Sequence, residues 1–94
     1  MTVRVVLPGA LREYADGLAE LSVDLPGSGT VGDVLDEALG TRSRLRSRVR
    51  DETGAIRRHV NVFVDGQECR TSGGLAHPVQ PTSVVHIIQS VSGG

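Results

Sequence analysis

Apolar and polar residues alternate along three stretches of the chain, a pattern typical of strands with one buried face. Residues 2–7, 20–25 and 59–64 each carry an apolar residue at every second position. A fourth stretch, residues 84–89, is apolar on both faces, which predicts a central strand covered on each side. The side chains expected to face inward on the first three strands are Val3, Val5, Leu7, Leu21, Val23, Leu25, Val60, Val62 and Val64.

Helical spacing appears between these stretches. Thr30 is a suitable N-cap, Asp33 follows three positions later as in a capping box, and Gly40 can serve as the C-cap, so we predict a helix over residues 31–39. Residues 10–16 predict a shorter helical turn. Residues 42–50 are ambiguous, because their arginines alternate as on a strand while Leu45 and Val49 lie one helical turn apart; we favour a short, exposed helix.

The turn signals complete the order of elements. Asp65-Gly66 predicts a hairpin after which residues 67–70 pair back, residues 75–79 form an irregular return, and residues 81–83 form another turn. The order strand, strand, helix, strand, strand, strand fits an α+β, β-grasp (ubiquitin-like) fold. We therefore expect a mixed sheet of about five strands wrapped around one main helix, with residues 1–90 as a single domain and residues 91–94 as a flexible tail ending in Gly-Gly.

Composition limits the chemistry. The 94 residues suit one small domain, and the aromatic residues are only Tyr14 and Phe63, so the core must be aliphatic. All ten basic residues are arginine, and the absence of lysine excludes a Walker-type phosphate loop, a Schiff-base lysine and a lysine general base. With two rings available, a cofactor stacked on aromatic walls is not expected. We expect no bound cofactor.

Charge is distributed unevenly around a formal net value of −1. Residues 1–41 carry two arginines against seven acids, a local charge of −5, and residues 42–58 carry seven arginines against two acids, a local charge of +5. The arginine-rich stretch is either a docking patch for an acidic partner or nucleic acid, or simply a solvated surface. We favour the solvated surface, because no aromatic residues are interleaved for base stacking. No signal-peptide pattern or membrane span is visible, so we expect a cytoplasmic protein with no nucleic-acid or membrane partner.

Other reactive side chains are isolated. Cys69 is the only cysteine, and we interpret it as a packing residue rather than a nucleophile. His59, His77 and His86 lie on separate elements without the spacing of metal ligands, so no metal site is expected. Residues 27–30 (GSGT) look like a phosphate cradle, but without a lysine they are better explained as a loop and a helix N-cap.

The last third of the chain resembles the ThiS/MoaD superfamily of ubiquitin-like sulfur carriers, most closely the CysO and MoaD types. The segments HVNVFVDGQECR, SGGL, PV and SVVHIIQSVSGG carry the resemblance, in that order. Two departures are visible: Gln89-Ser90 stands where many relatives have prolines, and residues 81–83 (PTS) replace a Gly-Asp/Glu turn.

The resemblance implies a protein co-substrate and not an enzyme. Its Gly94 carboxylate would be adenylated with ATP by a ubiquitin-activating-type enzyme, an adenylyltransferase and sulfurtransferase, and converted to a thiocarboxylate. Val91, Ser92 and Gly93 would thread into the partner's active site. The second partner would be a sulfur-accepting synthase, cysteine-synthase-like or another, in cysteine or thio-metabolite biosynthesis.

Three alternative functions stay open: the small subunit of molybdopterin synthase, a ubiquitin-like protein modifier, and a β-grasp interaction module whose tail is inert. The resemblance to ubiquitin-like domains also implies that an apolar sheet face beside the tail is the docking surface. Phe63, His86 and Ile88 are its candidate residues, although Phe63 is equally consistent with a place in the core.

Overall fold

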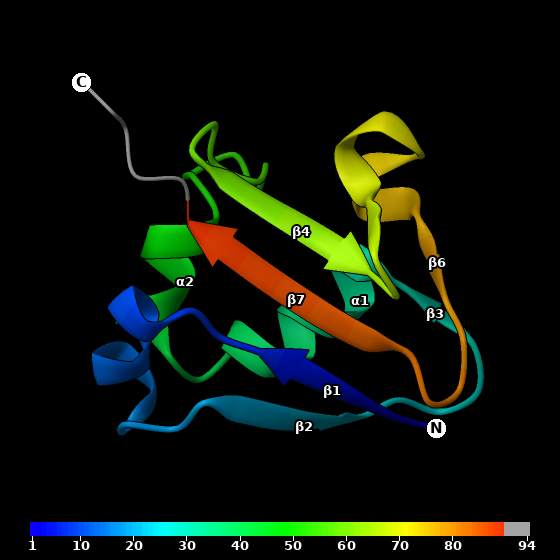
Figure 1. The fold of residues 1–94 in the computed structure, drawn as a ribbon, viewed down its shortest axis with the longest axis horizontal. Coiled ribbons are helices and arrows are strands. Elements are labelled where there is room, and N and C mark those ends of the chain that lie inside the picture. Colours follow the sequence, from blue (N-terminus) through cyan, green and yellow to red (C-terminus); the bar gives the residue numbers. More distant parts are fainter. Residues whose placement is uncertain (90–94) are drawn as a thin grey trace.

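A five-stranded mixed sheet forms the frame of the computed structural model, which describes residues 1–89 (Figure 1). The strands lie in the order β2-β1-β7-β4-β5; β1 and β7 run parallel, and the other neighbours are antiparallel. Their bounds are β1 Thr2–Val6, β2 Glu20–Asp24, β4 Val60–Val64, β5 Gln67–Glu68 and β7 Val84–Gln89. The predicted β-grasp architecture is confirmed.

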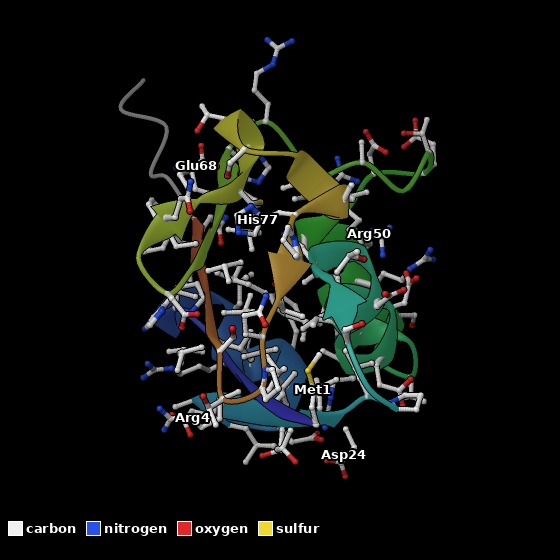
Figure 2. The ribbon with its side chains drawn as sticks, turned by 90° about the vertical axis from the view of Figure 1, so that its right-hand side faces the viewer. Met1, Arg4, Asp24, Arg50, Glu68 and His77 are labelled. Atoms are coloured by element: carbon white, nitrogen blue, oxygen red, sulfur yellow. The ribbon has the colours of Figure 1, made fainter. Side chains whose placement is uncertain are left out.

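The helices cover one face of this sheet. Figure 2, turned by a quarter from Figure 1, shows Arg50 on the helical side and Arg4 on the opposite side. Two short strands, β3 and β6, pair in a second small sheet that the sequence did not predict. The remaining bounds are η1 Gly9–Ala15, β3 Gly29–Thr30, α1 Val31–Leu39, α2 Ser43–Val49, η2 Cys69–Thr71, η3 Gly74–Ala76 and β6 Pro78–Val79.

Helix α1 begins and ends where its sequence predicts. The Thr30 hydroxyl accepts a hydrogen bond from the Asp33 amide at 3.2 Å, and the Asp33 carboxylate accepts one from the Thr30 amide at 3.0 Å. This reciprocal capping box satisfies two backbone donors that the first turn leaves free. At the other end, a Cβ on Gly40 would lie 2.6 Å from the Asp36 carbonyl oxygen, so the C-cap position requires glycine.

The core is aliphatic, as the composition predicts. Inward-facing residues of the strands pack against α1, and Leu11, Leu45 and Val49 extend this cluster from η1 and α2. No aromatic side chain is fully buried among the described residues. The face of α1 turned to the sheet carries Val31, Val34, Leu35, Ala38 and Leu39.

Two expectations about the strands are corrected. β7 is central, but only one of its faces is covered: Val85 and Ile87 are buried, whereas His86 and Ile88 are exposed. The strand expected over residues 67–70 ends at Glu68, because the chain turns at Cys69 into η2 and buries that side chain. The ambiguous arginine-rich stretch is helical, as favoured, in α2.

The Asp65-Gly66 turn joins β4 to β5 and also holds the start of β7. Both residues have positive φ, 48° and 90°, as a tight hairpin with this dipeptide requires. The Asp65 carboxylate accepts hydrogen bonds from the Ser83 hydroxyl and the Val84 amide, each at 2.9 Å. Because Ser83 is buried, the hydrogen bond between its hydroxyl and the Asp65 carboxylate replaces hydrogen bonds to water that these groups lose on folding.

The capping box of α1 predicts a measurable loss of stability when it is removed. Thr30→Ala should lower the free energy of unfolding by about 1 kcal/mol, because the Asp33 amide loses its acceptor. Urea denaturation followed by circular dichroism measures this difference. Ser28→Ala, an exposed change in the same loop, is the matched control; equal losses in the two variants would contradict the assignment.

Candidate functional site

The uncovered face of the sheet brings the three predicted docking residues together. In the antiparallel β4–β7 pair, Phe63 lies directly opposite His86, and Asn61 lies directly opposite Ile88. Opposed residues in an antiparallel pair share a face and lie within side-chain contact distance. Phe63, His86 and Ile88 therefore form one patch, which we call the outer patch.

Exposure differs across the outer patch. His86 is exposed, Phe63 is half-buried, and Ile88 keeps 45% of its surface accessible. Only Leu18 among the other described large hydrophobic residues is as exposed, at 46%, and it lies between η1 and β2, outside the β4–β7 pair. Phe63 is thus outside the core, which decides between its two interpretations.

Polar residues border the outer patch on the side of β1 and β2. Arg4 and Glu20 form an ion pair with 3.4 Å between Nη1 and Oε1, and both side chains are about half exposed. Val6 lies opposite His86 in the parallel β1–β7 pair and extends the apolar surface toward this border. An apolar centre with a charged rim is the usual anatomy of a protein interface.

The candidate reactive end of the chain follows directly from the outer patch. Ile88 is the neighbour of Gln89, the last residue of β7 and the last that the structure describes. Val91, Ser92, Gly93 and Gly94 lie outside the described residues. Gln89 pairs with Val60 of β4, so the point where the tail begins is held by the sheet.

The arginine-rich stretch is not the uniformly solvated surface that we expected. Arg50 is buried; its Nη1 donates to the Asp36 carboxylate, and its Nε donates to the Gly54 carbonyl at 2.7 Å. Arg42 forms an ion pair with Asp16 at 3.0 Å. These contacts connect α2 to α1 and η1, so part of the stretch is structural.

Two further arginines of α2 pack on the single tyrosine. The guanidinium carbons of Arg44 and Arg48 lie 5.3 and 4.7 Å from the ring centroid of Tyr14. At these distances a cation is attracted by the negative face of the ring. The aromatic partner that the arginine-rich stretch lacks in sequence is therefore supplied by η1.

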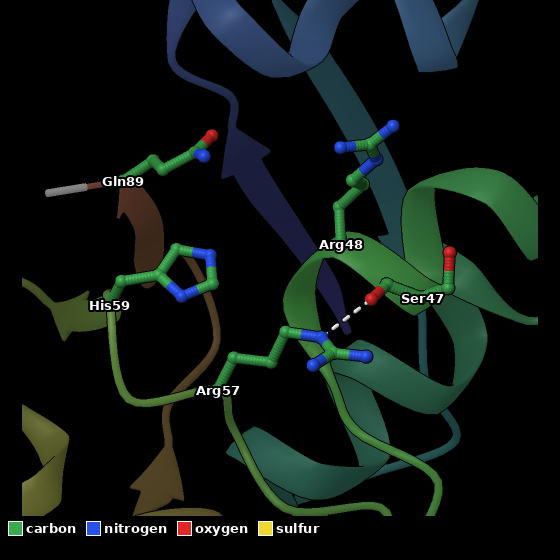
Figure 3. Close-up of a pocket in the computed structure, with 5 residues that line it drawn as sticks. All are labelled: Ser47, Arg48, Arg57, His59 and Gln89. Atoms are coloured by element: carbon green, nitrogen blue, oxygen red, sulfur yellow. Dashed lines mark hydrogen bonds between the residues drawn. The ribbon is translucent and has the colours of Figure 1, made fainter. Parts of the chain in front are cut away.

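A pocket of about 400 Å³ opens where α2, residues 57–59 and the end of β7 meet (Figure 3). Figure 3 shows two arginines and a histidine lining it, with Gln89 on the side where β7 ends. We call it the basic pocket. Its lining residues are Ser47, Arg48, Arg57, His59 and Gln89.

The isolated reactive side chains have structural roles. Burial raises the pKa of the Cys69 thiol, as expected for a packing residue. His77 Nδ1 lies 2.8 Å from the Ser72 carbonyl oxygen and 3.0 Å from its hydroxyl. Residues 1–89 contain no group of three His, Cys, Asp or Glu side chains placed to hold a metal. No helix in this part of the chain is long and apolar enough to cross a bilayer.

Comparison with solved structures places this architecture among ubiquitin-like β-grasp proteins. SAMP1 of Haloferax volcanii superimposes with a TM-score of 0.85 at 31% identity, covering 100% of both chains. The Amycolatopsis orientalis BexX/CysO complex gives a TM-score of 0.85 at 27% identity, covering 98% of this chain and 99% of the other.

Sequence comparison identifies the family. The sequence model of the ThiS family matches residues 5–94. Sulfur carrier protein CysO of Mycobacterium tuberculosis is 33% identical over 96 residues, 100% of each chain. The chain belongs to the ThiS family of ubiquitin-like sulfur carriers, proteins that act as carriers and not as catalysts.

Sequence reasoning missed several residues of this region. Asn61 and Val6 border the outer patch through strand pairing that no local pattern shows. Arg57 and His59 reach the basic pocket from the segment before β4. In the sequence, the only indication of a binding role was the charge of Arg57 and the titratable ring of His59 next to an apolar strand. The contact of Asp65 with Ser83 joins two turns that are far apart in the chain.

The raised pKa of Cys69 predicts slow thiol chemistry in the folded protein. Burial keeps the group as the neutral thiol and shields it from reagents, so reaction with a disulfide reagent at pH 8 should be at least about tenfold slower in the native state than in urea. Absorbance of the released thiolate measures both rates. Because Cys69 is the only cysteine, similar rates in the two states would contradict its burial.

Proposed function

We propose that the Gly94 carboxylate is the reactive group of this carrier. A carboxylate oxygen attacks the α-phosphate of ATP on a ubiquitin-activating-type enzyme and pyrophosphate leaves. A sulfide nucleophile then attacks the acyl carbon and AMP leaves, which forms the thiocarboxylate. The observation that carries the proposal is that the Gly-Gly end follows in the sequence directly after the central strand β7, on which Ile88 is exposed.

The composition of the tail supports this chemistry. A terminus that enters a narrow active site must pass without side-chain clashes, and glycine has no Cβ and adopts extended or unusual backbone angles freely. We propose that Val91, Ser92 and Gly93 occupy the partner's channel while Gly94 reacts. The carrier is then a co-substrate, used in the cytoplasm where ATP is available.

The outer patch is the proposed docking surface for the activating enzyme. Phe63, His86 and Ile88 offer an apolar centre, and the ion pair of Arg4 with Glu20 lies at its border. A partner that covers this face is also placed beside the end of β7. Binding and reaction are thereby brought to one side of the molecule.

We propose that the sulfur goes to a cysteine-synthase-like or another sulfur-accepting synthase, in cysteine or thio-metabolite biosynthesis. The support is full-length similarity to a sulfur carrier named CysO, and the structure of a CysO protein in complex with BexX. A modifier role is the second candidate, since small archaeal modifier protein 1 is 32% identical over 78 residues. An isopeptide-linked form in cell extracts would favour it, and a stable hetero-oligomer would favour the molybdopterin synthase subunit.

Removal of Gly94 tests the reactive group. Incubation of the wild-type chain with ATP, its activating enzyme and sulfide should add the mass of one sulfur-for-oxygen exchange, measured by mass spectrometry of the intact protein. The chain without Gly94 should show no shift, because its carboxylate stops short of the nucleotide. An unchanged shift in that variant contradicts the assignment.

Substitution in the outer patch tests docking. Ile88→Asp should raise the KM for the carrier in ATP–pyrophosphate exchange about tenfold with kcat unchanged, because a charge replaces an apolar contact. Leu18→Asp is the matched control, since Leu18 is equally exposed but directly precedes β2, which β1 separates from β7. Equal effects of the two substitutions would show that the outer patch is not the docking surface.

A further inference from the structure

The basic pocket holds positive charge that its own lining does not neutralise. Among residues 1–89, its lining includes two arginines and one histidine but no carboxylate. The pocket lies at the end of β7, beside the residue from which the tail continues (Figure 3). It therefore lies at the start of the proposed reactive tail, on the α2 side of the β7 end.

Both arginines are held in place by groups that leave their charge available. Arg57 Nε donates to the Ser47 carbonyl at 2.6 Å, and the Arg48 guanidinium lies 4.7 Å from the centre of the Tyr14 ring. Elsewhere, Arg42 and Arg50 are paired with carboxylates. Arg57 is thus held by a carbonyl oxygen and Arg48 by an aromatic ring, and neither is held by an acid. Guanidinium groups fixed in this way can bind a carboxylate of another molecule.

Asp51, an acid whose carboxylate is influenced by the charge of Arg57, is already occupied by other hydrogen bonds. One carboxylate oxygen of Asp51 accepts hydrogen bonds from the Thr53 amide, the Thr53 hydroxyl and the Ala55 amide. The Thr53 hydroxyl is the main cause of the lowered pKa of Asp51, and the charge of Arg57 contributes less. No ion pair joins Asp51 to Arg57 in the described part of the chain.

Gln89 supplies the second requirement. Its Oε1 is buried without a hydrogen-bond partner among the described residues, and the side chain lines the same pocket. A buried acceptor of this kind calls for an N–H donor. A peptide segment offers both a side-chain carboxylate for the arginines and a backbone amide for Gln89. A phosphodiester backbone offers no such donor.

We infer that the basic pocket receives an acidic side chain, together with a neighbouring backbone amide, from the enzyme that processes the tail. This inference rests on the proposed function for the identity of the partner. The arginine-rich segment would then have two roles: Arg42 and Arg50 fix the helices, and Arg48 with Arg57 recognises the partner. This contact lies outside the outer patch. It would recognise an acidic group of the partner, whereas the outer patch would recognise an apolar surface.

A peptide titration tests the pocket without the enzyme. The probe is the pentapeptide acetyl-Gly-Glu-Gly-Glu-Gly-amide, and its glutamine counterpart is the control. In ¹⁵N–¹H spectra of the full chain, the glutamate peptide should shift the amide signals of Arg57, His59 and Gln89, and the glutamine peptide should not. Arg57→Glu should abolish the shifts, while Arg58→Glu, the same charge change at an exposed neighbour outside the pocket, should keep them. Arg48→Glu provides a second test if Arg57→Glu does not fold.

The enzyme assay then tests the partner. With the cognate activating enzyme, Arg48→Glu and Arg57→Glu should raise the KM for the carrier about tenfold at unchanged kcat, and Arg58→Glu should not. If the wild-type chain gives no pyrophosphate exchange, the proposed function fails. The peptide titration still shows whether the basic pocket binds an acidic side chain. Equal effects of Arg57→Glu and Arg58→Glu in both assays overturn the inference.

Two other occupants would also overturn it. Shifts at the same three amides that are stronger with a short single-stranded oligonucleotide than with the glutamate peptide would assign the pocket to nucleic acid. The second is the chain's own terminal carboxylate. If, without any peptide, Arg57→Glu shifts the amide signal of Gly94 and Arg58→Glu does not, the basic pocket binds that carboxylate.

Discussion

Burial of only one face of the sheet is the constraint on which the rest of the structure depends. The core contains no fully buried aromatic ring among residues 1–89, so many small aliphatic side chains must all point to the helical side. A shift of one residue in the β4–β7 register would move Val62 and Val64 to the solvent. The same register places Phe63 against His86 on the outside. The outer patch is therefore a geometric consequence of the core.

Local patterns were sufficient for the elements whose partners lie nearby in the chain. Alternation predicted the long strands, and Thr30 with Asp33 predicted the start of α1, because both signals act within a few residues. The prediction failed for the outer side of β7. Apolar residues on both faces of a strand normally indicate that both faces are covered. Ile88 is nevertheless exposed, and the composition of a single strand cannot distinguish a covered apolar face from an exposed one.

The candidate site was predictable in part for the same reason. The outer-patch residues could be assigned to one face from their parity along β4 and β7, whereas the reactive tail stays a prediction from its glycines. The basic pocket could not, because it joins α2, residues 57–59 and Gln89 through tertiary contacts. The different roles of the arginines could not be predicted from the sequence either. Arg50 forms an ion pair with Asp36 on α1, and Arg48 packs on Tyr14 of η1.

The parallel pairing of β1 with β7 has a consequence for the order of synthesis. β1 comes before every other strand described in the chain, and its central partner begins only at Val84. Until β7 arrives, β1 and β4 each lack a neighbour and have open edges, and such non-local pairing is slow to form. The strand that closes the sheet is also the one that carries the tail. A chain truncated before Val84 would therefore leave open edges on β1 and β4, and open strand edges tend to pair with other chains.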